Sequence, residues 1–239
     1  MFLSLQDKFI RCFVEDDRWQ YLTRGLRNTL VITFFALLLG IAIGVVVAIV
    51  RSTYDKNKET LRPGFGTFLL KFADTICRLY LTVIRGTPVV VQLMIMYFVI
   101  MVSSRNGVVV ACITFGINSG AYVAEIIRGG IMSIDNGQFE AGRSIGLSYV
   151  QTMWHIIIPQ TFKNVLPALA NEFIVLLKET SISGYVGIVD LTKGGDIIRG
   201  TTFEAFLPLI GVALIYLIMV VFFSWLVSKL ERRLRNSDH

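Results

Sequence analysis

The stretch Glu140-Ala141-Gly142-Arg143-Ser144-Ile145-Gly146 is followed, after nine residues, by Ile156-Ile157-Ile158-Pro159. Charged residues and glycines punctuate it, although the chain on both sides is strongly apolar. A polar helix between hydrophobic segments cannot lie in lipid, because charged side chains are costly to place in hydrocarbon. We therefore expect this stretch to form a water-exposed loop between membrane spans, where it is free to hold a partner.

The composition is that of a membrane protein. Hydrophobic residues make up 54% of the 239, mean hydropathy is +0.65, and charged residues make up 17%, against about 25% in soluble domains. A membrane-spanning helix needs about 20 predominantly apolar residues. Four uncharged runs have the required length, at residues 28–50, 86–104, 106–124 and 205–228.

A fifth apolar segment, residues 161–183, is ambiguous by hydropathy because it carries Lys163, Glu172, Lys178 and Glu179. If it were a soluble buried helix, the even number of spans would leave both termini on the same side. We expect it to span. The predicted fold class is an all-α integral membrane protein with five transmembrane helices, over about 28–51, 65–104, 106–132, 160–183 and 204–229.

The N-terminal residues 1–24 precede a single predicted permease domain at 25–232, and 233–239 form a tail. Residues 1–27 contain acidic and basic side chains but no apolar core, so we do not expect them to be a cleaved signal peptide. Phe2, Leu5, Phe9 and Phe13 recur at helical spacing. They indicate an interfacial amphipathic helix, with a disordered tail as the open alternative.

Charge and cysteine usage exclude other classes. The net charge of +6 comes from basic residues scattered over loop ends and the tail, which suits lipid headgroups and predicts no nucleic-acid partner. The cysteines are three, widely spaced and without a C-x-x-C pair, and the two histidines are far apart. We therefore expect neither a disulfide framework nor a metal site.

The polar loop carries signals for a helix that is capped at both ends. Asp135 is a predicted N-cap, and Glu140 is expected to add negative charge to the first turn. The helix is predicted to run to Ile145, with Gly146 supplying a left-handed C-terminal residue. The alternative role for Glu140 is only to complement the helix dipole, and the alternative for the segment is an ordinary solvated helix.

A second helix is predicted to begin at Ser148, because Ser148 and Gln151 have the spacing of a capping box. Pro159 is expected near its end, where the chain turns into the next span. Gly142, inside the first helix, costs about 1 kcal/mol relative to alanine. A close backbone contact with a partner would explain it.

Two further blocks lie in the apolar regions. In Arg85-Gly86-Thr87-Pro88-Val89-Val90-Val91-Gln92-Leu93 the Gly-Thr-Pro sequence breaks any helix, so the arginine before it is not expected to face acyl chains. In 118–131, the residues Asn118, Tyr122 and Glu125 form one polar stripe on a helix. Gly116, Gly120 and Ala124 are four residues apart, which allows helices to approach closely.

These blocks, together with the polar loop and residues 171–181, resemble the permease subunits of polar amino-acid ABC importers of the histidine/glutamine type. The loop matches the family's E-A-A-x3-G-x9-I-x-L-P pattern, except that Gly142 replaces the second alanine and Ile158 replaces leucine. The resemblance runs from about Gly25 to the last span. It implies a type I importer permease fold (MetI-like), multi-pass in the bacterial cytoplasmic (inner) membrane, with the N-terminus outside and the C-terminus cytoplasmic.

The resemblance also implies partners. These are two copies of an ATP-binding ABC subunit, a second permease that is identical or a sister, and an extracytoplasmic amino-acid-binding protein. No Walker P-loop occurs in the chain, so we expect a non-enzymatic subunit without cofactors, with ATP bound and hydrolysed by the partner. The cytoplasmic loop 133–159, and the helix 135–146 in it, would couple to that partner through Glu140, Ala141, Gly142, Gly146, Ile156 and Pro159.

For the substrate pathway we expect the side chain of Glu172 to face the bundle interior, where it would meet an ammonium group of the substrate. The side chains of Asn118, Tyr122 and Thr87 would complete this site. The open alternative pairs Glu172 with Lys178 or an arginine. The alternative function is a channel or secondary-transporter subunit without an ATPase. Which amino acid is moved does not follow from the sequence.

Overall fold

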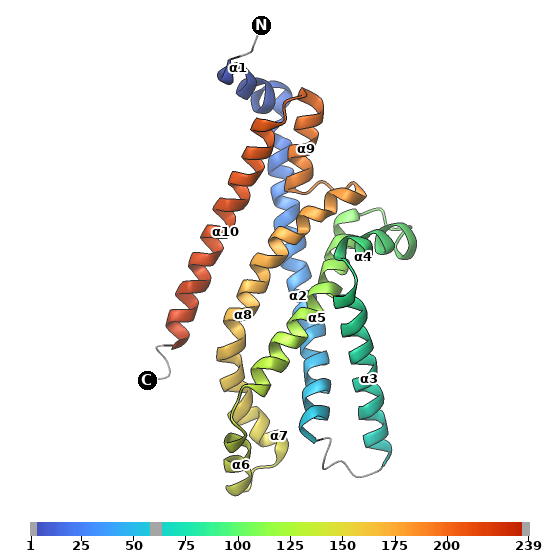
Figure 1. Cartoon of the computed structure of the whole chain (residues 1–239), viewed down its shortest axis with the longest axis vertical. Coiled ribbons are helices and arrows are strands. Elements are labelled where there is room, and N and C mark those ends of the chain that lie inside the picture. The colour runs from blue at the N-terminus through green and yellow to red at the C-terminus, as the bar shows by residue number, and fades with distance from the viewer. Residues whose placement is uncertain (1–3, 58–63, 236–239) are drawn as a thin grey trace. The chain divides into compact units, whose positions relative to one another are not determined.

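The computed structural model describes residues 4–57 and 64–235, and all the regular structure in these ranges is helical (Figure 1). The prediction of an all-α fold is thus confirmed. The long helices are α2 (Trp19–Asn57), α3 (Phe65–Gly86), α5 (Gly107–Met132), α8 (Ile158–Glu179) and α10 (Phe206–Arg235). The shorter α-helices are α1 (Leu5–Phe9), α4 (Val89–Ile95), α6 (Asn136–Ser144), α7 (Tyr149–Thr152) and α9 (Leu191–Thr202). Single turns of other helix types are η1 (Ile10–Val14), η2 (Glu15–Asp17), η3 (Met96–Ile100), η4 (Met153–Ile157) and η5 (Thr180–Val186).

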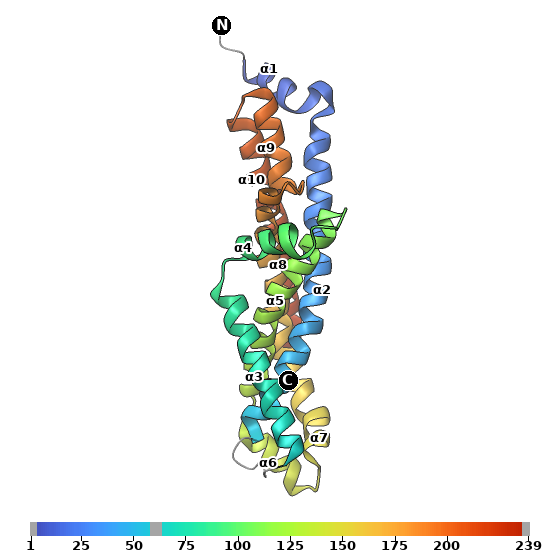
Figure 2. The ribbon, with the colours of Figure 1, turned by 90° about the vertical axis from the view of Figure 1, so that its right-hand side faces the viewer.

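The described helices group into two compact units. The first unit contains the described parts of Met1–Leu37, Val89–Gly116 and Phe173–Leu226, and the second contains those of Leu38–Pro88, Ile117–Glu172 and Val227–His239. Figure 2 shows the same helices turned by 90°. Each unit has its own packed core.

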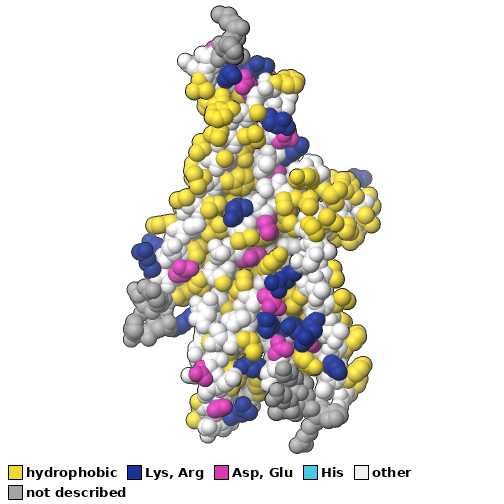
Figure 3. Space-filling model, in the orientation of Figure 1, with side chains coloured by type: hydrophobic (Ala, Val, Ile, Leu, Met, Phe, Trp, Pro, Cys, Tyr) yellow, Lys and Arg dark blue, Asp and Glu magenta, His cyan; other side chains and the backbone are white. Residues whose placement is uncertain are grey.

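Among the described residues, three helices are long and apolar enough to cross a membrane, within Trp19–Lys56, Gly107–Met132 and Phe206–Leu234. They contain most of the spans predicted at 28–51, 106–132 and 204–229. In α10 only 17% of the most apolar window is buried, and hydrophobic side chains cover broad areas of the face in Figure 3. An apolar surface of this extent suits contact with lipid. The helix α8 does not meet the same criteria of length and composition, so the predicted count of five spans stays a prediction.

The predicted span over 65–104 is broken. Helix α3 ends at Gly86, α4 begins at Val89, and α3 and the α4–η3 segment are bent by 106°. Thr87 is extended, as is usual before a proline, and Pro88 lacks the amide hydrogen that would continue the helix. The uncharged run at 86–104 is therefore not a span by itself, because its helical part is about 18 Å long at 1.5 Å per residue. The pair forms either one broken span or a re-entrant loop.

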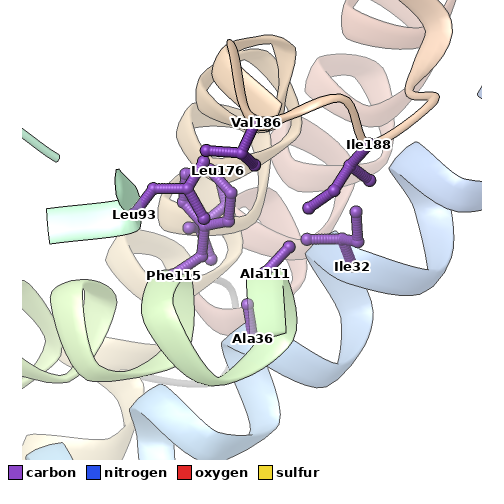
Figure 4. Close-up of a cluster of buried hydrophobic side chains, with 8 residues drawn as sticks. All are labelled: Ile32, Ala36, Leu93, Ala111, Phe115, Leu176, Val186 and Ile188. Carbon is purple, nitrogen blue, oxygen red and sulfur yellow. The ribbon is translucent and has the colours of Figure 1, made fainter. Parts of the chain in front are cut away.

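The core of the first unit joins α2, α4, α5, α8 and η5. Figure 4 shows side chains from these elements, and one from the segment that follows η5, gathered in one cluster: Ile32, Ala36, Leu93, Ala111, Phe115, Leu176, Val186 and Ile188. Phe115, Leu93 and Leu176 are fully buried. Where lipid is the solvent, van der Waals packing of this kind holds helices together, because lipid tails are as apolar as the side chains.

Helix α9 packs on the start of α2 through direct backbone contact. A Cβ at Gly25 would lie 2.4 Å from the Asp190 carbonyl oxygen, and one at Gly194 would lie 2.5 Å from the Tyr21 carbonyl oxygen. The Asp190 carboxylate caps α9 by accepting hydrogen bonds from the backbone N–H groups of Thr192 and Lys193. Burial raises the pKa of Asp190, and these hydrogen bonds oppose that shift.

In the second unit, glycines let α2 and α5 approach closely. A Cβ at Gly40 would lie 3.0 Å from the Ser119 hydroxyl, and one at Gly44 would lie 2.5 Å from Val123. Gly120 of α5 contacts Ile43 in the same way. The sequence predicts the small-residue face of α5. Its partner face on α2, with two glycines four residues apart, is a finding of the structure.

Six charged side chains link α2, α3 and α5 in the second unit. At their centre is Asp74 of α3, whose carboxylate accepts hydrogen bonds from Arg51 (3.1 Å) and Arg78 (2.7 Å). Asp55 lies 3.7 Å from Arg78 and 3.6 Å from Arg128, which also pairs with Glu125 at 2.9 Å. Three positive and three negative groups compensate one another. This ion-pair network explains how so many charges are tolerated beside apolar spans.

We expect Asp74→Asn to destabilise the protein strongly. The substitution keeps the shape but removes the negative charge between two arginines at a side chain that is only 4% exposed. Removing one partner of a buried ion pair costs about 3–5 kcal/mol. Thermal unfolding of the detergent-solubilised protein measures the loss.

The matched control is Asp196→Asn on α9. Asp196 also bonds to two cations, Lys193 and Arg199, but its side chain is 36% exposed. Exposed pairs contribute about 0–1 kcal/mol, so its melting temperature should change little. Equal shifts for the two variants would contradict the central position of Asp74.

Candidate functional site

The polar loop contains the short helix α6, which is capped at both ends. At its start, the Asp135 carboxylate accepts a hydrogen bond from the Gly137 N–H at 2.7 Å. At its end, Gly146 has φ +85°, the Gly146 N–H bonds to the Arg143 carbonyl, and the Leu147 N–H bonds to the Gly142 carbonyl. This pair of bonds is a Schellman motif. Both predicted caps are confirmed.

The second helix of the loop begins as predicted. The Ser148 hydroxyl accepts from the Gln151 N–H, while the Gln151 side chain accepts from the Ser148 N–H, which completes a capping box. The expected end at Pro159 is wrong, because helical structure continues through α7 and η4 into α8. Pro159 is the second residue of α8. The π-helical turn just before it changes the hydrogen-bond register, which accommodates a residue without an amide hydrogen.

The inner face of α6 packs against the same chain. Phe139 is 7% exposed and forms a cluster with Ile131, Ile134 and Ile157. The Lys56 ammonium lies 4.4 Å above the Phe139 ring and donates a hydrogen bond to Asn136 at 2.8 Å. The end of α2 thereby holds the start of α6.

Gly142 is required by this internal packing. A Cβ there would lie 2.6 Å from Cγ2 and 2.7 Å from Oγ1 of Thr152 on α7. This contact with Thr152 explains the glycine at position 142. The sequence alone suggests instead the close approach of a partner's backbone. Among the predicted coupling residues, Gly142 is buried. It therefore lies inside the loop and not on its surface.

The outer face of α6 is exposed and polar. Its exposed residues include Glu140, Ala141 and Arg143, and Gly146 is exposed beyond its end. Of the predicted coupling residues that follow, Ile156 is half-buried and Pro159 is exposed. A cleft of about 370 Å³ opens beside this face, lined by Lys56, Asn136, Phe139, Glu140, Arg143, Tyr149 and Thr152.

Glu140 lies in the second turn of α6, not in the first as expected. Helix α6 begins at Asn136, and no acidic residue falls in its first turn. Because the helix-dipole effect falls off within that turn, complementing the dipole does not explain Glu140. In the described part of the chain its carboxylate forms no ion pair, although Lys56 and Arg143 line the same cleft. It is exposed and available to a partner.

A second candidate site surrounds Glu172 of α8. Glu172 is 8% exposed, and its carboxylate accepts a hydrogen bond from the Ser119 hydroxyl of α5 at 2.9 Å. Within residues 4–57 and 64–235 no cation lies within ion-pair distance of it, so the proposed pairing with Lys178 or an arginine is not found. The interior position predicted for Glu172 is confirmed. Ser119, beside the predicted stripe residue Asn118, was missed.

The other predicted pathway residues differ in their burial. Asn118 is buried, at 3% exposed. Tyr122 is exposed, and the Arg85 guanidinium lies 5.6 Å from the centre of its ring. Thr87 is exposed and donates to the Val83 carbonyl. The remaining stripe residue, Glu125, pairs with Arg128 and belongs to the ion-pair network.

Along α5, Ser119 and Tyr122 are three residues apart, a rise of about 4.5 Å. One turn of this helix therefore carries both the partner of a buried carboxylate and the ring under a guanidinium. The negatively charged Glu172 and the positively charged Arg85 thus both contact a single turn of α5.

Residues 64–236, which include the capped loop and Glu172, match the family model described as "Binding-protein-dependent transport system inner membrane component". The chain belongs to this family of membrane permeases. A relative named "Glutamine transport system permease protein GlnP", from Escherichia coli (strain K12), is 34% identical over 218 residues, covering 90% of this chain and 93% of its own length.

Solved structures agree with this family assignment. The structure titled "Crystal structure of an amino acid ABC transporter with histidines" has a TM-score of 0.81 and 36% identity, covering 98% of this chain and all of that one. The MetNI methionine ABC transporter in an inward-facing conformation gives a TM-score of 0.75 at 20% identity, over 92% of this chain and 99% of that one, and shows the fold alone. The chain is thus a membrane permease subunit of an amino-acid ABC importer with an all-helical, MetI-like fold.

Membership in a permease family of ABC importers also favours a transport subunit over an enzyme. The same family membership favours an ABC importer over a channel or a secondary transporter.

We expect Gly142→Ala to separate α6 from α7, because the new methyl group would overlap Thr152. Limited proteolysis of the loop at 133–159 in reconstituted protein should then proceed faster. Gly142→Ala/Thr152→Ala should restore resistance, since only the Cβ atom of residue 152, at 3.2 Å, remains close.

Gly129→Ala is the control for adding a methyl group to a helix. A Cβ at Gly129 meets nothing within 4 Å, so its cleavage rate should match the unsubstituted protein. Rapid cleavage in the double variant would show that the Thr152 contact is not the reason for glycine.

Proposed function

We propose that this permease translocates an amino acid that an extracytoplasmic binding protein delivers, and that a separate ATPase drives it through α6. The observation that supports the proposal best is the presence, in a binding-protein-dependent permease family, of a short helix with two complete caps and an exposed polar face. Such a helix can transmit force because its ends do not fray.

The proposed docking surface is the outer face of α6 with the adjoining turn at Gly146. Its inner face is occupied by Phe139 and Gly142, so a partner can contact α6 only from outside. Glu140 would be the polar anchor, because its carboxylate is exposed and without an ion pair in the described ranges. Ile156 and Pro159 would support the loop from the continuous helix of α7, η4 and α8.

The proposed topology has five spans in the bacterial inner membrane. They are α2, the α3–α4 pair, α5, α8 and α10, with the N-terminus outside and both α6 and the C-terminus in the cytoplasm. The charges of α8 do not exclude it as a span, because Glu172 is buried and hydrogen-bonded and Lys163 and Lys178 lie toward the two ends of the helix. A polar group in a span is tolerated where it faces protein.

The proposed assembly has two permeases, identical or sister chains, and two ATP-binding subunits. Closure of the ATPase pair on ATP would move both docking helices together. Because α5 and α8 are joined to the loop at its two ends, movement of α6 would be transmitted to the helices that carry Ser119 and Glu172. This is a two-state mechanism, in which ligand binding at one site shifts the conformation at another.

The proposed substrate class is amino acids, recognised through the groups they share. Glu172 would bind the ammonium group, and Arg85, stacked on Tyr122, would bind the carboxylate. Both charges lack an ion-pair partner in the described residues, unlike the six charges of the ion-pair network. The relative is named for glutamine and the solved structure carries histidines in its title. The head group common to amino acids is therefore a better basis for recognition than any one side chain.

We expect Glu140→Lys to abolish stimulation of ATP hydrolysis by the loaded binding protein, because it reverses the charge of the proposed anchor. Gly146→Pro should do the same, since proline cannot adopt φ +85°. Both variants should still insert into membranes, because neither residue lies in a predicted span. ATPase activity of reconstituted complexes is the measurement.

Gln138→Lys is the matched control, because it adds the same charge at another exposed position of α6 without removing a carboxylate. Its stimulation should remain. Normal stimulation in Glu140→Lys would remove Glu140 from the coupling role.

We expect Glu172→Gln to weaken transport while preserving the complex. Glutamine can still accept the Ser119 hydrogen bond, but the charge is lost, and a hydrogen bond to a charged group is worth about 1.5–3 kcal/mol. Apparent substrate affinity should therefore fall on the order of tenfold or more. Basal ATP hydrolysis and thermal stability should remain.

Ser119→Ala separates the binding role from a structural one. It leaves the Glu172 charge in place and removes only its hydrogen-bond donor. If Glu172 is structural, Ser119→Ala should lower the melting temperature at least as much as Glu172→Gln. Unchanged transport in a stable Glu172→Gln complex would overturn the substrate assignment.

A further inference from the structure

The N-terminal segment of residues 4–14, formed by Ser4, α1 and η1, has one face packed on the first unit. Cys12 is fully buried and Phe13 packs in the same cluster, together with Leu22, Leu191, Ile198 and Val212. The Phe13 ring would lie 3.4 Å from a Cβ at Gly211 of α10. Lys8 pairs with Glu204 at 2.9 Å. The segment is therefore an ordered part of the fold, with a complete capping box at Ser4 and Asp7.

The segment also carries apolar side chains that remain exposed, and among them Phe9 borders the packed Phe13, with 5.0 Å between the ring centres. Leu5 is 69% exposed, Phe9 51% and Val14 56%. Within the first unit, these exposed side chains have no covering element among the described residues. Two phenylalanines near Glu204, Phe203 and Phe206, are exposed as well, at 90% and 68%. A group of large apolar side chains thus remains at one end of the first unit, after the packing of the chain is complete.

Contacts with α10 indicate how deep these exposed apolar side chains lie relative to the membrane. The run 205–228 contains no charged residue and is long enough to cross the hydrocarbon core. Lys8 binds Glu204, the last charge before the run, and Phe13 contacts Gly211 inside it. The segment therefore lies at the level where α10 changes from polar to apolar, which is the level of the membrane interface. Its exposed apolar side chains continue the lipid-facing surface of α10.

The charges of the segment indicate whether electrostatic attraction or apolar burial would drive its contact with lipid. Residues 4–18 contain three basic side chains, Lys8, Arg11 and Arg18, and four acidic ones, Asp7, Glu15, Asp16 and Asp17. A surface without net positive charge is not attracted to anionic headgroups, so burial of its apolar side chains has to supply the affinity.

We propose that the exposed apolar side chains of residues 5–14 insert into the headgroup–acyl boundary of the bilayer and hold the start of α10 at a fixed depth. The contacts Lys8–Glu204 and Phe13–Gly211 connect this interfacial anchor to α10. These side chains contact lipid, and neutral lipid suffices.

The experiment places a nitroxide spin label on single cysteines in a variant whose native Cys12, Cys77 and Cys112 are replaced by serine. Labels replace Phe9 and Val14, which are apolar and exposed, and two exposed polar controls, Gln6 in the segment and Glu15 directly after it. The complex is studied in nanodiscs of pure phosphatidylcholine. Collision rates with oxygen, which concentrates in lipid, and with a water-soluble nickel chelate report the depth of each label.

We expect the labels at 9 and 14 to be accessible to oxygen and protected from nickel, and those at 6 and 15 to show the reverse. Replacing a third of the lipid by anionic phosphatidylglycerol should leave all four ratios unchanged. Equal nickel accessibility at the four positions would overturn the proposal. So would protection of 9 and 14 only after the binding protein is added, which would make these side chains part of a protein-docking surface. Insertion only with anionic lipid would overturn the apolar mode of binding.

Discussion

Close approach of α2 and α5 is the constraint on which the second unit depends. Gly40 and Gly44 of α2 have no side chain to separate the two backbones, and Ser119, Gly120 and Val123 of α5 fill the space. In lipid, no hydrophobic effect between helices compensates for a poor fit, so contact at van der Waals distance supplies the cohesion. A larger residue at Gly40 would displace Ser119, whose hydroxyl donates a hydrogen bond to Glu172.

Helices α2 and α5 also carry the ion-pair network, together with α3. This network solves a different problem. Arg51, Asp55 and Arg128 lie where the spans approach the polar loop, and each charge has an opposite one within 4 Å. Paired in this way, the residues connect α3 to α2 and α5 without leaving a bare charge beside lipid. Glu172 and Arg85 have no ion pair in the described ranges and are not part of this network.

The loop between α5 and α8 is stiff for local reasons. Its caps at Asp135, Gly146 and Ser148 satisfy backbone groups that a short helix would otherwise leave to water. Packing of Phe139 on Ile157 and of Gly142 on Thr152 then makes α6 and α7 one body. Because the inner face of α6 is packed, a displacement of α6 can be transmitted to α5 and α8. A solvated helix on a flexible loop would move without displacing them.

By itself, the sequence determined the class of the protein, its most apolar long helices and the caps of the polar loop. These depend on runs of apolar residues and on residues two to four positions apart, which interact wherever the rest of the chain lies. The interior position of Glu172 was also within reach, because a charge in an apolar segment is stable only when it is shielded from lipid. The tertiary structure decided what depends on distant residues. It placed Thr152 against Gly142, where a partner contact was expected, provided Ser119 for Glu172, and paired Arg51 of α2 with Asp74 of α3. Spacing along the chain cannot predict such pairs, because they form only when helices from separate parts of the sequence are packed together.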